Sequence, residues 1–446
     1  MDTSKYIDFI KTKFPDQPEF IQSVEEVVSC IGPVLDKHPE WVKNKVVERL
    51  LEPEHMVSFR VVWEDDNGEP HVNIGYRCQF NGALGPYKGG LRFAPNVYPG
   101  LIKGLAFEMI FKNALTGLPI GGGKGGSDFN PNGRSDREVM RFCQAYMSEA
   151  FKHIGSDIDV PAGDLGVGAR EIGYLFGQYK RITGRHEAGV LTGKDPSTGG
   201  LLGRSEATGF GIVTFLQRML EVNHESIEGK TAVISGFGNV AWSTALRLEQ
   251  VGAKLIAFSG PDGYILDEDG ITGDKVAYML ELRSSGKDIC EPYAEKYPNA
   301  KFFKGEKPWG VKADLYIPCA TQNDVHLEDA KRIVENGCKF YCEGANIPTT
   351  PDAMEYLLSH DVIVGPAKAA NAGGVACSCI EMGQNAEHTV FSKEEVLAKL
   401  EVIMKNIHDT AAAASHEYGF GYNLVAGANI AGFIRVAKAM ESQGLV

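Results

Sequence analysis

The spacing of hydrophobic residues predicts helices first and an antiparallel hairpin next. Within residues 1–55, apolar residues recur every three or four positions in "SVEEVVSCIGPVLDKHPE" and "WVKNKVVERLLEPE", which is helical spacing. Apolar residues then alternate from Val72 to Phe80, and the turn sequence "DNG" precedes them, so a hairpin is expected. Helical spacing returns over residues 101–115 and again in "REVMRFCQAYMSEAFKHIG", a helix predicted to end near Gly155.

After about residue 200 the pattern changes to short apolar strands that alternate with helices. The predicted strands are "TAVISG", "KLIAFSG", "DLYIPCA", "KFYCEG" and "DVIVGPA". This alternation is typical of a parallel sheet with crossover helices, which places the chain in the α/β class. The stretch "LTGKDPSTGGLLGRS" before it contains Gly, Ser and Pro and suits a hinge.

The length of 446 residues exceeds what one hydrophobic core usually supports, so we expect two domains separated by a cleft. We assign residues 1–200 to a substrate-binding and oligomerisation domain and residues 201–421 to a Rossmann-type, doubly wound dinucleotide-binding domain. The last segment, residues 422–446, is predicted to be a helix that returns to the first domain.

Composition and charge exclude several classes of function. The net charge of −13 and the lack of a dense Lys/Arg run argue against nucleic-acid binding and against an anionic membrane surface. The start "MDTSKYIDFIKTKF" has no apolar centre of a signal peptide, and no apolar run is long enough to span a membrane. The nine cysteines show no paired CxxC spacing, so we expect a reduced, cytoplasmic protein without zinc or another bound metal.

One lysine, Lys124, stands among glycines in "GLPIGGGKGGSDF". A phosphate-binding loop is excluded, because that motif needs Gly where Leu118 stands and Ser or Thr where Gly125 stands. A flexible surface loop with a solvated lysine is the simpler alternative. Our interpretation is that glycine, which lets a ligand come close to the backbone, allows a substrate to pack against Lys124.

A dinucleotide motif follows the first strand of the second half. Gly236-x-Gly238-x-x-Ala241 lies between a predicted strand and a predicted helix, where it permits a tight turn and the approach of a pyrophosphate to the helix N-terminus. The next strand ends near Asp262, whose carboxylate suits the ribose hydroxyls of NAD and repels the additional phosphate of NADP. An ordinary Pro-Asp-Gly turn explains Asp262 equally well.

Three lysines, Lys88, Lys112 and Lys124, fall close together in the sequence of an acidic protein. Several ammonium groups in one pocket suit a small dicarboxylate, and their mutual repulsion and burial lower the pKa of one amine enough to make it a base. Asp164 in "DIDVPAGDLGVGARE" supplies a carboxylate for proton transfer. With a nicotinamide cofactor, these residues point to hydride transfer at a carbon that bears nitrogen or oxygen.

Motifs in the same order along almost the whole chain resemble those of the hexameric glutamate dehydrogenases of bacteria and protists. They are "GPYKGGLRF", "LPIGGGKGGSDF", "DVPAGDLGVGAREIGY", "EATGFG", "GFGNVAW", "PCATQN", "EGANIPTT", "NAGGV" and "GYNLVAGANIAGF". The resemblance implies reversible oxidative deamination of L-glutamate to 2-oxoglutarate and ammonia by a homohexamer. Phe237 with Pro261-Asp262 resembles the NAD-using members, so NAD is expected, and NADP stays possible.

The resemblance also implies a role for each matching residue. Lys124 would activate water for attack on the iminium, and Asp164 would transfer the proton. The substrate residues would be Lys112 for the α-carboxylate, Lys88 and Ser378 for the side-chain carboxylate, and Gly163 and Asn371 at the amino end. The cofactor residues would be Thr208, Gly236, Phe237, Gly238, Asn239, Val240, Asp262 and Asn346.

Two positions depart from the family pattern. Met109 stands where relatives commonly have a Gln that assists the α-carboxylate, and a thioether cannot donate a hydrogen bond. Cys379 follows Ser378 where relatives usually have Gly. Both departures bear on how tightly this chain holds its substrate.

Two other functions remain open at this point. A dehydrogenase of leucine, valine or phenylalanine resembles this chain but tends to have an apolar residue in place of Lys88, so Lys88 with Ser378 favours glutamate. A non-catalytic dinucleotide sensor is the second alternative, and the presence of both Lys124 and Asp164 argues against it.

Overall fold

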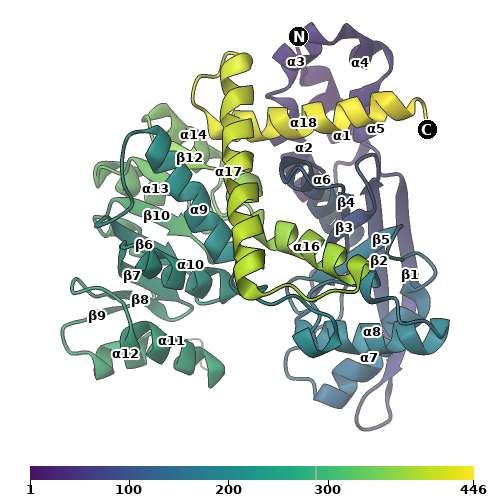
Figure 1. Ribbon diagram of the computed structural model, residues 1–446, viewed down its shortest axis with the longest axis horizontal. Helices are drawn as coiled ribbons and strands as arrows, with labels where there is room; N and C mark the ends of the chain where they lie inside the picture. The colour runs from purple at the N-terminus through teal and green to yellow at the C-terminus, as the bar shows by residue number, and fades with distance from the viewer. Residues whose placement is uncertain (287–288) are drawn as a thin grey trace. The chain divides into compact units, whose positions relative to one another are not determined.

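The computed structural model describes residues 1–286 and 289–446, which fall into two compact units (Figure 1). The first unit contains Met1–Leu202, Val375–Val396 and Asn429–Val446, and the second contains Gly203–Gly374 and Leu397–Ala428. These units differ from the predicted domain ranges, which placed all of residues 201–421 in one domain. The segment Val375–Val396 belongs to the first unit, and within that unit Glu381 and Gln384 hydrogen-bond to Lys194 and Gly200.

The first unit is built on a five-stranded sheet with the strand order β1-β2-β4-β3-β5. The strands are β1 (His55–Glu64), β2 (Pro70–Asn81), β3 (Tyr87–Phe93), β4 (Gly121–Ser127) and β5 (Asp159–Gly163). β1 and β2 form the predicted hairpin, and Gly68 supplies a positive φ of 80° in its turn. β4 pairs antiparallel to β2 and parallel to β3, and β3 runs parallel to β5.

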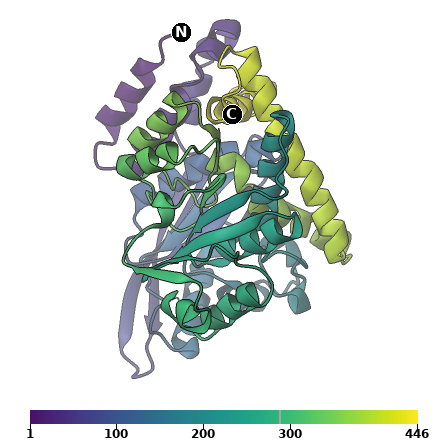
Figure 2. The same cartoon turned by 90° about the vertical axis from the view of Figure 1, so that its left-hand side faces the viewer.

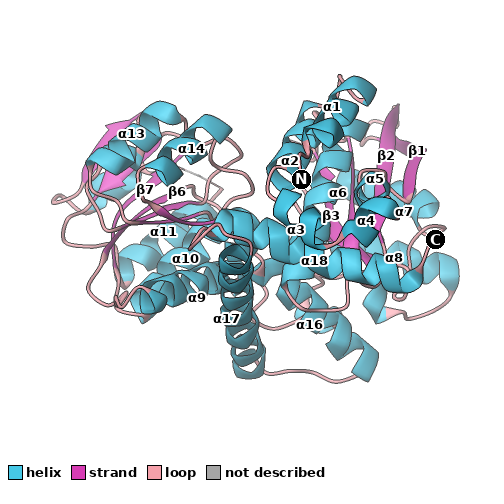
Figure 3. Ribbon diagram, turned by 90° about the horizontal axis from the view of Figure 1, so that it is seen from above, coloured by secondary structure: helices cyan, strands magenta, loops and turns pink. Residues whose placement is uncertain are grey.

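Helices cover both faces of this sheet. They are α1 (Ser4–Lys13), α2 (Pro18–Val28), α3 (Gly32–Lys37), α4 (Pro39–Lys43), α5 (Val46–Leu50), α6 (Pro99–Leu115), α7 (Asp136–Ala150) and α8 (Ala169–Thr183), with 3-10 turns at Ala188–Val190 and Pro196–Thr198. Figure 3 shows α2 and α6 on one face and α7 and α8 on the other. A capping box between Ser135 and Glu138 begins α7, which ends at Ala150, before the predicted end at Gly155.

Both ends of the chain lie against the short helices of the first unit (Figure 2). The amino group of Met1 donates to Asp36 of α3, and Arg49 of α5 donates to the carbonyl groups of Gly444 and Val446. The predicted C-terminal helix is α18 (Leu424–Gln443). Its part beyond Asn429 belongs to the first unit, where the rings of Phe433 and Trp41 pack edge to face.

The second unit contains a seven-stranded sheet with the order β12-β11-β10-β6-β7-β8-β9. The strands are β6 (Thr231–Ser235), β7 (Lys254–Gly260), β8 (Gly263–Leu266), β9 (Lys301–Lys304), β10 (Leu315–Pro318), β11 (Phe340–Cys342) and β12 (Ile363–Gly365). The five predicted strands, β6, β7, β10, β11 and β12, are parallel, as expected. The sequence pattern does not predict β8 and β9, which are antiparallel and only four residues long.

Crossover helices lie on both faces of this sheet, which makes it doubly wound. The helices are α9 (Ala207–Val222), α10 (Asn239–Gln250), α11 (Asp274–Ser284), α12 (Glu291–Lys296), α13 (Leu327–Glu335), α14 (Pro351–Ser359) and α15 (Ala367–Ala370), with a 3-10 turn at Pro308–Gly310. α13 and α14 cover one face, and α9 and α10 the other (Figure 3). The chain passes between the units within α16 (Gly373–Glu387), α17 (Lys393–Glu417) and α18. No helix in the described ranges is both long and apolar enough to cross a membrane.

Candidate active site

Lys124 lies on a strand rather than in a loop. The glycine-rich segment forms β4, in the middle of the sheet between β2 and β3, so the alternative of a flexible surface loop is wrong. Glycine is rare in strands, which is why propensity alone indicated a loop. All seven residues of β4 are buried, and Lys124 is only 4% exposed. The alternative of a solvated surface lysine is therefore excluded.

The glycines of β4 make room for other parts of the protein. A Cβ atom on Gly126 would stand 2.2 Å from the carbonyl oxygen of Arg92, and one on Gly122 would stand 2.6 Å from Cγ1 of Ile110 in α6. A Cβ on Gly125 would meet Leu91 at 2.8 Å and Arg77 at 3.0 Å. The interpretation that these glycines admit substrate is therefore corrected, because protein atoms already occupy the space beside them.

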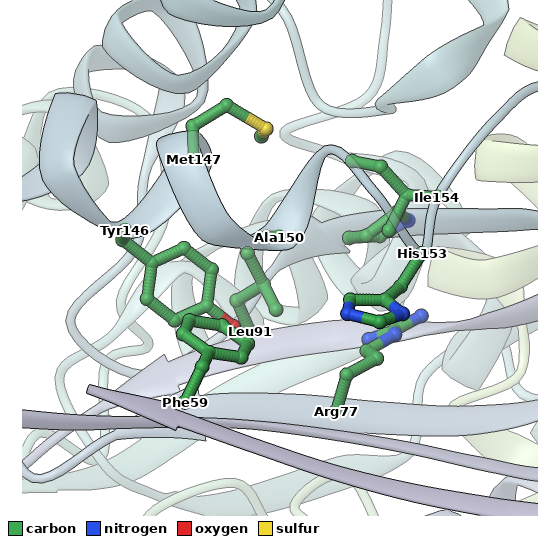
Figure 4. Close-up of a pocket in the computed structure, with 9 residues that line it drawn as sticks. Phe59, Arg77, Leu91, Tyr146, Met147, Ala150, His153 and Ile154 are labelled. Carbon is green, nitrogen blue, oxygen red and sulfur yellow. The ribbon is translucent and has the colours of Figure 1, made fainter. Parts of the chain in front are cut away.

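A buried ion pair ties together the strands around Lys124. Arg77 of β2 donates to the carboxylate of Asp159 through Nε at 2.8 Å, and to the carbonyl of Gly89 at 3.1 Å. The side chains of Arg77 and Asp159 are 2% and 0% exposed. Gln79 donates to the same carboxylate at 3.0 Å. Figure 4 shows Arg77 at the wall of a small pocket, beside His153 and below α7. This arrangement fixes β2, β3 and β5 relative to one another.

Lys124 and Asp164 contact each other at the end of β5, as the sequence suggested. Lys124 Nζ lies 3.2 Å from Asp164 Oδ1, and Arg92 Nε donates to Asp164 Oδ2 at 2.8 Å. Arg92 comes from β3, where the neighbouring Gly90 leaves space for Asp164, since a Cβ on Gly90 would stand 2.8 Å from that of Asp164. Arg92 was not among the predicted site residues, although it lies in the motif "GPYKGGLRF".

Burial and the neighbouring charges shift the pKa values of this cluster in opposite directions. Burial lowers the pKa of Lys124, Asp164 raises it, and Arg92 lowers it further, with a net shift below the ordinary value. Burial alone raises the pKa of Asp164, but the charges of Lys124 and Arg92 hold it well below the ordinary value. The direction for Lys124 agrees with the expectation from the sequence. The neighbouring cation that lowers the pKa of Lys124 is Arg92, whereas the sequence suggested another lysine.

The other predicted substrate residues of the first unit lie on β3, α6, β5 and α16. Lys88 of β3 and Ser378 of α16 are 0% and 2% exposed, and Lys112 on α6 is half-buried. Burial raises the pKa of the Cys379 thiol to about 11, and the charge of Lys88 acts against this shift. Lys88 is therefore within electrostatic reach of the part of α16 that carries Ser378. Gly163 is the last residue of β5, directly before Asp164.

The dinucleotide motif occupies the switch point of the second unit. β6 pairs with β7 on one side and β10 on the other, and Gly236 directly follows β6. Gly236 has a φ of 98°, and a Cβ there would stand 2.8 Å from Ala320. No atom lies within 4 Å of a Cβ built on Gly238, and α10 begins at the next residue without a side-chain cap. An exposed cradle with free helix N–H groups fits a pyrophosphate.

The predicted cofactor residues differ in what they offer this cradle. Asn239 is exposed and Val240 half-buried at the start of α10. The ring of Phe237 is buried against Trp242 and Phe258, so only its backbone is available there. Asp262 lies in the two-residue turn between β7 and β8, and its carboxylate accepts N–H groups of Cys290 and Glu291 at the start of α12. The turn interpretation of Asp262 is confirmed, and its role toward ribose stays a prediction.

Asn346 and Asn371 meet in the second unit. Asn371 Nδ2 donates to Asn346 Oδ1 at 3.0 Å and to the carbonyl of Gly344 at 3.1 Å. Asn371 Oδ1 is buried and has no hydrogen-bond partner among the described residues, which is uncommon for a buried polar atom. Thr208 Oγ1 would stand 2.8 Å from a Cβ on Gly374. Asn371 thus lies with the predicted cofactor residues in the second unit, and the other predicted substrate residues lie in the first.

Known proteins match this chain over almost its full length. Residues 199–444 match the family described as Glutamate/Leucine/Phenylalanine/Valine dehydrogenase, and residues 53–181 match its dimerisation domain. The chain is 56% identical to an NAD-specific glutamate dehydrogenase of Clostridium symbiosum, with 99% of each chain covered. It is 49% identical to an NADP-specific enzyme of a Psychrobacter strain, with both chains fully covered.

Solved structures agree with these sequence matches. A glutamate dehydrogenase that is 56% identical superimposes with a TM-score of 0.98 and covers 99% of both chains. The glutamate dehydrogenase of Plasmodium falciparum is 45% identical, has a TM-score of 0.96, and the match covers 99% of this chain and 94% of that one. The chain therefore belongs to the Glutamate/Leucine/Phenylalanine/Valine dehydrogenase family.

Proposed function

We propose that this chain is an NAD-dependent glutamate dehydrogenase, which catalyses the reversible oxidative deamination of L-glutamate to 2-oxoglutarate and ammonia. The observation that carries the proposal is the buried contact of 3.2 Å between Lys124 and Asp164. Two cations of the first unit, the buried Lys88 and the half-buried Lys112, match in number the two carboxylates of glutamate. The names of the relatives at 56% and 51% identity support NAD as the cofactor.

The residues of the first unit divide the reaction into binding and proton transfer. Lys112 would hold the α-carboxylate, and Lys88 with Ser378 would hold the side-chain carboxylate. Lys124, whose pKa burial lowers, would accept a proton from water and so prepare it to attack the iminium carbon. Asp164, kept ionised by Lys124 and Arg92, would take and return the proton of the amino group.

The second unit would supply the nucleotide. Its residues would hold NAD, whose nicotinamide would supply the acceptor for the hydride from the α-carbon of glutamate. The cradle at Gly236 and Gly238 would hold its pyrophosphate with the N–H groups of Asn239 and Val240. Asn371 Oδ1, which has no hydrogen-bond partner in the described part of the chain, would accept a hydrogen bond from the ligand beside Asn346.

We further propose that the enzyme is a cytoplasmic homohexamer. The nine cysteines all lie in the described ranges and form no disulfide with one another, which suits a reducing compartment. The matched dimerisation domain over residues 53–181 supports assembly from several copies.

The test is the loss of NADH absorbance when the protein is mixed with 2-oxoglutarate and ammonium. We expect rapid turnover with NADH and slower turnover with NADPH at equal concentration. The oxo acids of leucine, valine and phenylalanine should react poorly, because they have no second carboxylate for Lys88. Preference for one of those oxo acids would contradict the substrate, and a clear preference for NADPH would contradict the cofactor. Inactivity with every oxo acid and with glutamate would favour a dinucleotide sensor.

A further inference from the structure

The segment 191–200, "LTGKDPSTGG", is buried at its start. We expected a hinge there, yet Leu191 and Thr192 are 0% exposed and Lys194 is 4% exposed. All of these residues belong to the first unit. A buried lysine in such a segment needs a partner, because an unpaired charge is costly to bury.

The partner of Lys194 is Glu381 on α16. Lys194 Nζ donates to Glu381 Oε1 at 2.8 Å and also to the carbonyl of Leu191. The backbone N–H of Gly193 donates to Glu381 Oε2 at 2.9 Å. Both side chains of the pair are 0% exposed. Each carboxylate oxygen therefore has a donor, and the pair fixes α16 in one position along the segment.

Two further residues of α16 hold the same segment. Gln384 Nε2 donates to the carbonyl of Gly200 at 3.3 Å, and Asn385 Nδ2 donates to that of Gly199 at 3.2 Å. Glu381, Gln384 and Asn385 lie three and four residues apart, so they share one face of the helix. This face of α16 is attached to segment 191–200 over more than one turn.

The other side of the segment is attached to the strand that ends at the catalytic carboxylate. The N–H of Thr192 donates to the carbonyl of Pro161 in β5 at 3.0 Å. A Cβ on Gly193 would lie 3.8 Å from the nitrogen of Gly163. Ser378 precedes Glu381 by three residues on α16, and Lys88 acts on the thiol of the adjacent Cys379. Segment 191–200 therefore links α16 to β5.

We propose that Lys194 and Glu381 are positioning residues, which place Ser378 beside Lys88 and so determine the preference for a substrate with a second carboxylate. The proposal rests on the proposed function, because it assigns Ser378 and Lys88 to the side-chain carboxylate of glutamate. Glu381 is a buried residue of α16 and Lys194 is buried against it, so both act through this helix, without touching the substrate.

The experiment compares glutamate with norvaline, which has the same carbon skeleton and lacks the second carboxylate. In Glu381→Gln, the ratio of kcat/KM for glutamate to that for norvaline should fall about tenfold to a hundredfold, because a small displacement of Ser378 weakens only the carboxylate contact. The kcat/KM for norvaline should stay close to that of the unaltered enzyme. Glu138→Gln is the matched control, since Glu138 is a nearly buried carboxylate of α7 that pairs with Arg134, and its ratio should not change.

A double-mutant cycle with Ser378→Ala separates positioning from general structural damage. If Glu381 acts through Ser378, Glu381→Gln should not lower the ratio further in the Ser378→Ala background. Equal falls in both backgrounds would overturn the proposal, as would a Glu381→Gln enzyme with an unchanged ratio. If Glu381→Gln does not fold, Asn385→Ala tests the same attachment and should lower the ratio to a smaller extent. An unaltered enzyme that does not oxidise glutamate would refute the proposed function itself, which distinguishes the two failures.

Discussion

The carboxylate of Asp164 contacts two cations, because Arg92 binds it in addition to Lys124. Arg92 holds Oδ2 and Lys124 faces Oδ1, so the carboxylate presents one defined oxygen to the lysine. The charge of Arg92 lowers the pKa of Lys124 and of Asp164 alike. Its contribution should therefore be visible in the pH dependence of the reaction.

Replacing Arg92 should move the rising limb of the pH–rate profile to higher pH. In Arg92→Gln, the neighbouring positive charge is lost and Asp164 pairs with Lys124 alone, and both changes raise the pKa of Lys124. More alkaline solution is then needed to free the amine, by about one pH unit. The profile of kcat/KM for glutamate measures the shift. Arg92→Lys keeps the charge and should shift less, and a limb that moves to lower pH in Arg92→Gln would contradict this assignment.

Met109 should weaken the binding of glutamate. It is half-buried on α6, three residues before Lys112, and its sulfur cannot donate a hydrogen bond. Met109→Gln supplies a donor on the same helical face, so the KM for glutamate should fall by about threefold to tenfold while the KM for NAD stays constant. Met109→Leu serves as the control and should leave both constants unchanged. An unchanged or higher KM for glutamate in Met109→Gln would show that this position does not reach the α-carboxylate.

At the scale of single elements, the neighbours of β4 explain why this strand consists largely of glycine. β3 and α6 pack so closely against it that even a methyl group meets backbone or side-chain atoms of its neighbours. The close packing brings the lysine of β4 to the end of β5 without any bulky residue between them. The strand is a consequence of tertiary packing, which overrides the weak strand propensity of glycine.

Gly126→Ala should therefore be strongly destabilising. Its Cβ would stand 2.2 Å from the carbonyl oxygen of Arg92, so β3 has to move away from β4. We expect a loss of about 2 kcal/mol or more, as in overpacked cores, measured as a lower Tm. Gly173→Ala in α8 is the control, because nothing lies within 4 Å of its added Cβ and alanine favours a helix. Its Tm should rise slightly, and equal Tm values for the two variants would argue against the packing explanation.

The elements that could be predicted from the sequence are those in which the spacing of apolar residues matches the spacing of buried positions. The hairpin of β1 and β2 and the five parallel strands of the second unit follow directly from alternating or continuous apolar residues. β4 was not predictable, because its identity depends on how closely its neighbours approach. Arg92 was visible only as a letter in a motif, since its contact with Asp164 depends on the pairing of β3 with β5. Lys194 and Glu381 are far apart in the sequence, and only the fold brings them together.

At the scale of the whole molecule, the net charge does not describe the candidate site. The net charge is −13, yet Lys88, Lys124 and Arg77 are buried in one sheet of the first unit. A chain of net negative charge can attract an anionic substrate only where cations are gathered locally. That the chain binds no nucleic acid stays a prediction from its composition.

The edge of the first sheet points to contact with another copy of the chain. β1 is an edge strand, and the directly opposite Val62 and Val72 are 50% and 64% exposed on one face of the hairpin. Ile74, two residues along β2 on the same face, is 40% exposed. Exposed apolar pairs on an unprotected edge strand favour association, and the matched dimerisation domain includes this hairpin.

Light scattering should give the unaltered protein a mass about six times the 48.5 kDa of one chain. In Val62→Lys with Val72→Lys, two charges replace the apolar pair and would have to be desolvated at the interface, so we expect the mass to fall to that of a smaller assembly. Val402→Lys is the matched control, because Val402 is a 59% exposed valine on α17 of the second unit, and its mass should equal that of the unaltered protein. If the unaltered protein had the mass of one chain, hexamer formation would be refuted. If the paired variant kept the full mass, the hairpin would not be part of the interface.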